Sequence, residues 1–161
     1  MSLLQEMNNE QPIPQHEAGR LFVGMLINEC YETMVPEIMA GLQDGPPGGQ
    51  PPADGLQRSK WFQSLQAAEQ KEIQGIIEYS LELCLFHLLN IFDGTSPVQP
   101  IKEQASDFAV YLQTYDSDED LDSGKPKTAT RVNPVAPDYA NDEEQLHDIF
   151  SEMMNDLTAR Q

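Results

Sequence analysis

The chain has 161 residues, which is long enough for one domain with a hydrophobic core of its own. Its 27 acidic and 9 basic residues give a formal net charge of −18. This charge argues against direct binding to nucleic acids or to anionic membranes, because both attract Lys and Arg. The composition favours an acidic, soluble protein, and any partner that it selects by charge should be basic.

The two cysteines and the N-terminal residues bear on the compartment of the protein. Cys30 and Cys84 both lie in apolar helical patterns, which favours two buried free thiols over a disulfide. Free thiols suit a reducing compartment. Residues 1–15 are polar and contain two prolines, so they predict a flexible arm and not a secretory signal. We therefore expect a cytoplasmic protein.

Residues 16–42 predict the first long helix. Apolar residues recur there at helical spacing, at Val23, Ile27, Cys30, Met34 and Ile38. Pro36 interrupts this run, because proline lacks an amide donor and its ring clashes with the preceding turn. We expect the helix to kink there or to split after Val35.

A linker and a second helical segment follow. Residues 44–55 are rich in Pro and Gly, which excludes helix and strand and permits an antiparallel return. The next helix is expected from Leu56 to Phe92. A polar stretch in its first half indicates a break near Ala67 or Ala68, which would give two helices in place of one.

The second half of this segment predicts the central element of the fold. Residues 81–92 are apolar on both faces, which is typical of a helix that is buried all round. Glu78 and Glu82 interrupt the apolar run, so we expect it to be too short for a membrane span. Asp93 and Gly94 should end the helix, with Gly94 in a left-handed cap.

Residues 106–140 predict a small β element and an acidic loop. Aromatic and β-branched residues alternate with period two over 106–115, which is typical of a strand. Residues 116–122 form an acidic run that is expected to be a solvated loop. Residues 128–132 could return as a second strand, and such a hairpin needs helices to pack against.

The last predicted element is an amphipathic helix at residues 141–161. Asn141 and Glu144 have the spacing of a capping box, and acids crowd the first turn, where the helix dipole favours them. One side of this helix is apolar, with Leu146, Ile149, Phe150, Met153, Met154 and Leu157.

The acidic run only partly matches a calcium-binding loop. Asp116, Asp118 and Asp120 have the alternating spacing with which an EF-hand loop begins. The sixth and twelfth positions are Leu121 and Lys127, where that loop needs a glycine and a bidentate glutamate. We therefore predict no metal site in this run.

Signatures of catalysis are also weak. Glu144 and His147 form one Glu-x-x-His pair, whereas di-iron bundles need that pair twice. His87 lies on the apolar helix, where a hydrogen-bonded core histidine is the favoured interpretation. No nucleophile elbow, phosphate loop or dinucleotide fingerprint occurs in the sequence. We predict no catalytic residue and no cofactor.

An acidic C-terminal part is the first candidate for protein binding. Residues 106–161 hold 13 acids and 4 bases, a net charge of −9, and residues 1–105 spread the same net charge over nearly twice the length. Such a surface speeds encounter with a basic partner, although it can also serve solubility alone. The predicted contact acids are Asp116, Asp118, Glu119, Asp120, Asp122, Glu143, Glu144, Asp148 and Glu152.

The terminal helix is the second candidate. Its adaptable apolar side chains Phe150, Met153 and Met154 would suit docking in the groove of another protein. Covering the core of its own domain is the favoured alternative for this stripe. The Met stripe or the Trp61/Phe62 region could also form a homodimer seam.

One sequence pattern carries a family resemblance. Residues 88–94, LLNIFDG, end a two-helix unit in an apolar run closed by Asp-Gly, and a predicted strand follows. Over residues 16–116 this pattern resembles small acidic bacterial proteins, several of which are similar to immunity proteins of polymorphic toxin systems. The resemblance implies an inhibitor that binds a toxin domain, and it carries over no catalytic residue.

The sequence thus predicts a mainly α (α+β) fold with a long helical hairpin around a buried central helix. The expected segments are a flexible arm at 1–15, a helical domain with a terminal strand at 16–115, an acidic, Pro-containing loop or return strand at 116–140, and the terminal helix at 141–161. The predicted function is non-enzymatic protein binding, most concretely by an acidic immunity or inhibitor protein that occludes a basic partner. The alternatives are an adaptor or secretion-chaperone-like protein that recruits through its terminal helix, and a metal-dependent enzyme with helix carboxylates.

Overall fold

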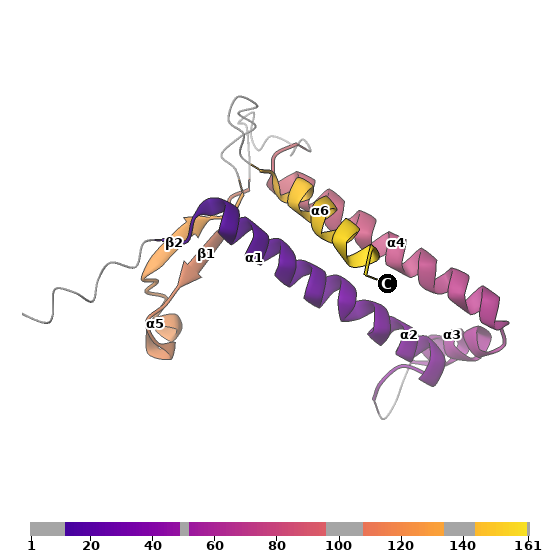
Figure 1. The fold of residues 1–161 in the computed structure, drawn as a ribbon. Coiled ribbons are helices and arrows are strands. Elements are labelled where there is room, and N and C mark those ends of the chain that lie inside the picture. Colours follow the sequence, from indigo (N-terminus) through magenta and orange to yellow (C-terminus); the bar gives the residue numbers. More distant parts are fainter. Residues whose placement is uncertain (1–11, 49–51, 96–107, 134–143, 161) are drawn as a thin grey trace, which may run out of the picture. The chain divides into compact units, whose positions relative to one another are not determined.

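A computed structural model describes residues 12–48, 52–95, 108–133 and 144–160. The protein is mainly helical with a small two-stranded antiparallel sheet, as predicted (Figure 1). Its elements in chain order are α1 (Gln15–Ile27), the π-helix η2 (Asn28–Glu32), α2 (Met34–Asp44), α3 (Ala53–Gln63), α4 (Ala67–Phe92), β1 (Tyr111–Thr114), α5 (Asp118–Ser123), β2 (Thr128–Arg131) and α6 (Leu146–Thr158).

The chain divides into two compact units. Unit 1 joins the residues up to Val23 to those from Leu89 onward, and unit 2 comprises Gly24–Leu88. Unit 1 is therefore built from both ends of the chain, and the boundaries between the units fall within α1 and α4. Each unit has buried side chains of its own and is described by itself.

The first predicted helix is interrupted earlier than we expected. The interruption consists of η2 and Thr33, and Pro36 lies within the first turn of α2 instead of ending a helix after Val35. Proline is tolerated in a first turn, because an amide there has no partner within the helix. The first amide of this turn to bond backward is that of Glu37, to the carbonyl of Thr33 at 3.3 Å.

The break predicted near Ala67 is present as residues 64–66, between α3 and α4. Ser64 Oγ donates a hydrogen bond to the carbonyl of Trp61 at 2.6 Å and so closes the end of α3. The amide of Gln66 donates to the carboxylate of Glu69 at 2.7 Å, which is the acidic half of a capping box. Local side-chain bonds thus end one helix and begin the next.

The prediction that the central helix is buried all round is wrong. Among its large apolar residues only Leu85 and Leu89 are buried, whereas Ile76, Tyr79, Leu83 and Leu88 are exposed. Cys84 and His87 are exposed too, contrary to the expected buried thiol and core histidine, and Cys30 is half-buried. Both cysteines are free, as predicted.

The expectation that this helix is too short to span a membrane is also wrong on length and composition. α4 is one helix of 26 residues, with an 18-residue window of mean hydropathy 1.4, of which 11% is buried. The core helix of a soluble protein can meet the same two criteria, so the finding is weak by itself. Gly94 ends α4 with φ 71°, the left-handed cap that the sequence predicts.

The core of unit 1 forms where α6 packs on α1 and on the end of α4. Its buried apolar side chains are Ala18, Val23, Leu89, Val132, Leu146, Ile149, Phe150 and Met154. Gly19 permits the close approach of α6, because a Cβ there would lie 3.2 Å from Cδ1 of Ile149. The rings of Phe22 and Phe92 extend this core with centroids 6.2 Å apart.

The N-terminus of α6 is capped by Asp93, the residue that follows α4, and not by the predicted capping box. Oδ1 of Asp93 accepts the amide of Leu146 at 3.1 Å, and Oδ2 accepts the amide of His147 at 3.0 Å. Nδ1 of His147 also lies 2.8 Å from Oδ2 of Asp93, and since a carboxylate only accepts, Nδ1 is the donor. Glu144 precedes the helix, and Asn141 lies outside the described residues.

The predicted hairpin is present and is tied to the helices by a buried amide. β1 and β2 pair antiparallel with Tyr111 opposite Arg131 and Thr114 opposite Thr128. The side chain of Asn133, fully buried, donates to the carbonyls of Phe92 and Phe108, the latter at 2.7 Å, and accepts the amide of Val110 at 2.8 Å. This residue joins the end of α4 to both sides of the hairpin.

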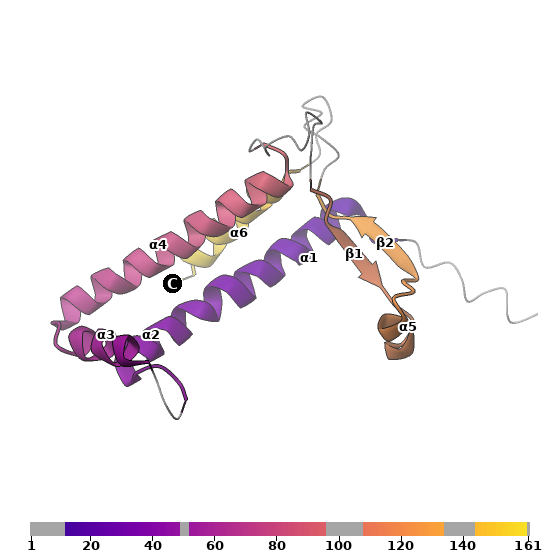
Figure 2. The ribbon, with the colours of Figure 1, turned by 180° about the vertical axis from the view of Figure 1, so that it is seen from behind.

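Unit 2 has a smaller core. Its buried side chains are those of Ile27, Val35, Ser59, Phe62 and Leu85. Figures 1 and 2 both show α2 and α3 side by side, and Nε2 of Gln63 in α3 donates to the carbonyl of Gln43 in α2. The ring of Phe62 is buried, whereas neighbouring Trp61 is exposed.

Candidate functional site

The acidic run predicted as a loop folds in large part into the short helix α5. Ser117 is its N-cap and accepts the amide of Asp120 at 3.2 Å, while Oδ2 of Asp120 accepts the hydroxyl of Ser117 at 2.8 Å. At the other end Gly124 has φ 66°, and the amide of Lys125 donates to the carbonyl of Asp120 at 3.0 Å. The acids therefore stand on an ordered helix, because both ends of the run carry capping residues.

The two strands of the hairpin hold α5 in place. The helix lies within the connection from β1 to β2 (Figure 1). Below it the hydroxyls of Thr114 and Thr128 share a hydrogen bond, and the amide of Lys127 donates to the carbonyl of Thr114 at 2.7 Å. Nζ of Lys127 pairs with Asp116 at 2.9 Å, so this acid is already neutralised.

Three acids of α5 remain uncompensated around an exposed leucine. Asp118, Glu119 and Asp122 are exposed, and no cation among the described residues lies within ion-pair distance of them. Leu121, on the same short helix, is 54% exposed. An exposed apolar side chain with acidic neighbours on the same helix has the composition of a small interface, in which an apolar anchor is accompanied by a polar rim.

Of the other predicted contact acids, Glu144, Asp148 and Glu152 are described, and they lie elsewhere, each near a partner within unit 1. Arg20 in α1 forms a two-bond pair with Glu152 at 3.1 and 3.2 Å and lies 3.6 Å from Glu144. The hydrogen bond and charge of Arg20 lower the pKa of Glu152, and Glu152 in turn raises the pKa of Arg20. Asp148 lies 3.7 Å from Nε2 of His147. Glu143 is outside the described residues.

The structure therefore separates the predicted acids into two groups. Figures 1 and 2 both show α5 at one end of the hairpin and α6 away from it, beside α1 and the end of α4. In the α6 group Arg20 pairs with Glu152 and lies near Glu144, so one positive charge is shared between two acids. Among the described residues no cation pairs with Asp118, Glu119 or Asp122, so α5 presents the less compensated group of acids.

The apolar stripe of α6 faces the core of unit 1. Phe150 is 2% exposed, Met154 is buried and Met153 is half-buried. Phe150 and Met154 can reach a partner only if α6 leaves its place, which would break the cap at Asp93 and expose the unit 1 core. The geometry favours the interpretation that this stripe covers its own domain.

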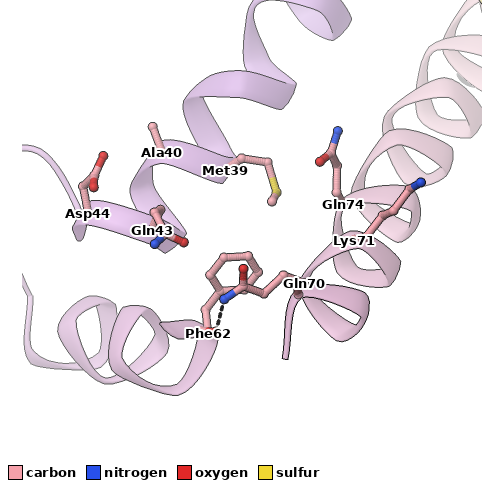
Figure 3. A pocket seen from close by; sticks show the side chains of 9 residues that line it. Met39, Ala40, Gln43, Asp44, Phe62, Gln70, Lys71 and Gln74 are labelled. Carbon is pink, nitrogen blue, oxygen red and sulfur yellow. Dashed lines mark hydrogen bonds between the residues drawn. The ribbon is translucent and has the colours of Figure 1, made fainter. Parts of the chain in front are cut away.

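Unit 2 holds an open cavity of about 440 Å³ between α2, α3 and α4. Figure 3 shows Met39 pointing toward the ring of Phe62, and Nε2 of Gln70 donates to the carbonyl of Phe62 at 3.0 Å. The two charged residues of the lining, Asp44 and Lys71, come from different walls, α2 and α4. This lining offers apolar contacts and amides but no paired acid and base of the kind that catalysis uses.

The described ranges contain no cluster of three His, Cys, Asp or Glu side chains that could hold a metal ion. Comparisons of the chain with protein-family models, with curated proteins and with solved structures found no match.

Sequence reasoning found the acids of this site but missed its apolar centre. Leu121 was considered only as the residue that disqualifies a calcium loop. The pattern Ser-x-x-Asp at 117–120, followed by Gly124, is a capping signal from which the short helix could have been predicted. Once α5 is recognised as a helix, Leu121 is an apolar residue among acids on a surface element.

Proposed function

We propose that this protein is a non-catalytic binding protein that holds a basic protein partner against α5. Its most concrete form is an inhibitor of the immunity type, which occludes a basic toxin domain. The observation that carries the proposal is the capped helix α5, on which exposed Leu121 lies among the uncompensated Asp118, Glu119 and Asp122.

The acids and the leucine have different roles in this proposal. Uncompensated acids, together with a net charge of −18, attract a basic surface over long range and speed its encounter. Leu121 then supplies the short-range contact that slows dissociation, as a buried apolar anchor does in other interfaces. The caps of α5 hold these side chains in one arrangement before binding, which lowers the entropy cost of association.

The proposal is tested by capture with the tagged full chain from a lysate of the source organism, at low and at moderate salt. We compare the natural chain with the double variant Glu119→Gln/Asp122→Asn, which leaves the N-cap Ser117 and the first-turn acids Asp118 and Asp120 in place. A matched control, Glu17→Gln/Glu37→Gln, removes two exposed charges from α1 and α2.

We expect one basic protein, held at near-stoichiometric level, whose binding weakens with salt and falls at least tenfold in the α5 variant but not in the control. Leu121→Ala should speed dissociation at both salt concentrations, because its contact is apolar. Unchanged affinity and unchanged salt dependence in the α5 variant would refute the assignment of the site. A captured protein that is lost equally from both charge variants would also refute it, since only general charge would then matter.

A further inference from the structure

One face of α4 remains open in unit 2. Residues three and four apart on a helix share a face, and this face carries Glu72, Ile76, Tyr79, Ser80, Leu83 and His87. All six residues are exposed, with Ile76 at 63%, Tyr79 at 64% and Leu83 at 40%. Three apolar or aromatic side chains and Ser80 lie between Glu72 at one end and His87 at the other.

The remaining acids in this stretch of α4 point elsewhere. Glu78 and Glu82 are half-buried on another side of the helix. There, burial of Tyr31, together with the negative charges of these two acids, raises the pKa of Tyr31. The open face is therefore free of the repulsion that these two acids would cause. Glu69, three residues before Glu72, is a second exposed carboxylate on this side of α4, and it accepts the amide of Gln66 at 2.7 Å.

Two copies of this face are complementary when their helices run antiparallel. In an antiparallel pair centred between residues 79 and 80, Glu72 comes opposite His87 and Ile76 comes opposite Leu83. A two-fold axis repeats each contact, which gives two acid–histidine pairs at the ends and two apolar pairs between them. A histidine ring nitrogen can donate to a carboxylate, so the end contacts are hydrogen bonds.

We propose that a second copy of this chain covers the open face, with the two α4 helices antiparallel about an axis between Tyr79 and Ser80. The complementarity of Glu72 and His87 selects this occupant. A basic partner would leave His87 without an acid, and an apolar surface would leave both end groups unpaired at a cost. An anionic bilayer would be repelled by the net charge of −18.

Association must still overcome the repulsion between two acidic chains. Salt screens charges separated by more than about 8 Å at physiological ionic strength, whereas the apolar contacts at the centre do not weaken. Dimerisation should therefore be stronger at moderate salt than at very low salt. The proposed dimer does not depend on binding through α5, which belongs to unit 1.

The first test is sedimentation equilibrium of the full chain over a wide concentration range at moderate salt. We expect a monomer–dimer equilibrium that Leu83→Glu and Ile76→Glu weaken at least tenfold, because each puts two like charges into the apolar centre. Leu121→Glu, at a leucine of α5 whose exposure of 54% lies between those of Leu83 and Ile76, is the matched control and should leave the equilibrium unchanged. Circular dichroism checks that every variant keeps its helix content.

A monomer at all concentrations would overturn the proposal, and so would a dimer that Leu83→Glu and Ile76→Glu leave intact. A charge reversal tests the ends of the seam: His87→Glu should weaken the dimer, and adding Glu72→Lys should restore it. Failure of the double variant to recover the dimer would exclude the proposed pairing of residues 72 and 87.

Disulfide trapping tests the direction of the two helices. With Cys30→Ser and Cys84→Ser removing the natural thiols, Ser80→Cys should form a disulfide between copies, because residue 80 lies next to the axis. The natural Cys84 should not, since its two copies would be roughly 13 Å apart along the helix direction at 1.5 Å per residue. Trapping through Cys84 and not through residue 80 would overturn the antiparallel arrangement.

Discussion

Unit 1 buries more of its apolar side chains than unit 2, although its Leu21, Phe108, Tyr111 and Leu121 are exposed. Unit 1 turns the buried ones inward around α6, and its buried polar groups, Asp93 and Asn133, are hydrogen-bonded to backbone atoms on other segments. Unit 2 buries few, while its exposed large apolar residues are Met25, Met34, Leu56, Trp61, Ile76, Tyr79, Leu83 and Leu88. Unit 1 therefore has the larger buried core among the described residues, and unit 2 has the larger number of exposed apolar side chains.

The largest expected effect separates the inside of unit 1 from the outside of unit 2. Phe150→Ala removes a ring that is almost fully buried, so we expect it to lower the free energy of unfolding by about 3–5 kcal/mol. Trp61→Ala removes a larger but exposed ring of unit 2. It should change the free energy of unfolding by about 0.5 kcal/mol or less. Urea unfolding followed by circular dichroism measures both. Equal losses would mean that the two units do not differ in the way described.

A smaller effect distinguishes the buried polar groups of the two units. Asn133→Ala leaves one amide and two carbonyls of unit 1 without their partner, and we expect a loss of about 2–3 kcal/mol. Ser59→Ala in unit 2 removes one long hydrogen bond, which Nε2 of Gln63 donates to Oγ of Ser59 at 3.4 Å. This change should lower the free energy of unfolding by about 1 kcal/mol or less. The same unfolding assay tests the pair, and a Ser59→Ala loss as large as that of Asn133→Ala would contradict this contrast.

The smallest expected effect is the ion pair at the surface of unit 1. Arg20 lowers the pKa of Glu152 below its ordinary 4.5, so the folded state gains stability from this group above that pH. The gain is lost as the pH falls through the lowered pKa, because the protonated side chain no longer carries the charge. It should be small, since both side chains are exposed.

Urea midpoints of the natural chain and of Glu152→Gln, compared over the acid range, measure this gain. The difference between the two proteins should be greatest near neutral pH and should vanish at strongly acidic pH. Asp54→Asn breaks an exposed pair within α3 of unit 2 and provides the control. A Glu152→Gln difference that persists below the lowered pKa would have to come from packing and not from charge.

Local signals in the sequence were sufficient for most of the elements. Four features were predicted correctly because each depends on neighbours a few residues away. They are the left-handed cap at Gly94, the break before Ala67, the strand β1 and the apolar stripe of α6. The prediction of a loop for the acidic run is wrong, because it rests on charge alone and leaves out the capping residues Ser117 and Gly124. The acids of the candidate site were thus predicted, but the helix and the leucine that organise them were not.

Contacts between distant segments were beyond this reasoning. The N-terminus of α6 is capped by Asp93, more than fifty residues earlier in the chain, and a local capping box was expected in its place. The burial of α4 was misjudged for the same reason. An apolar sequence shows that a helix can be buried, but the number of elements available to cover it is a property of the whole fold.

The sequence by itself determined the mainly helical class, the small hairpin, the ends of several helices and the strongly acidic surface. These follow from backbone preferences, periodicity and charge, which act over a few residues or need no fold at all. Only the tertiary structure decided which acids are neutralised by Arg20 and Lys127, which remain open on α5, and which face of α4 stays uncovered. Pairing and exposure depend on which segments meet in space, and that is settled only when the chain has folded.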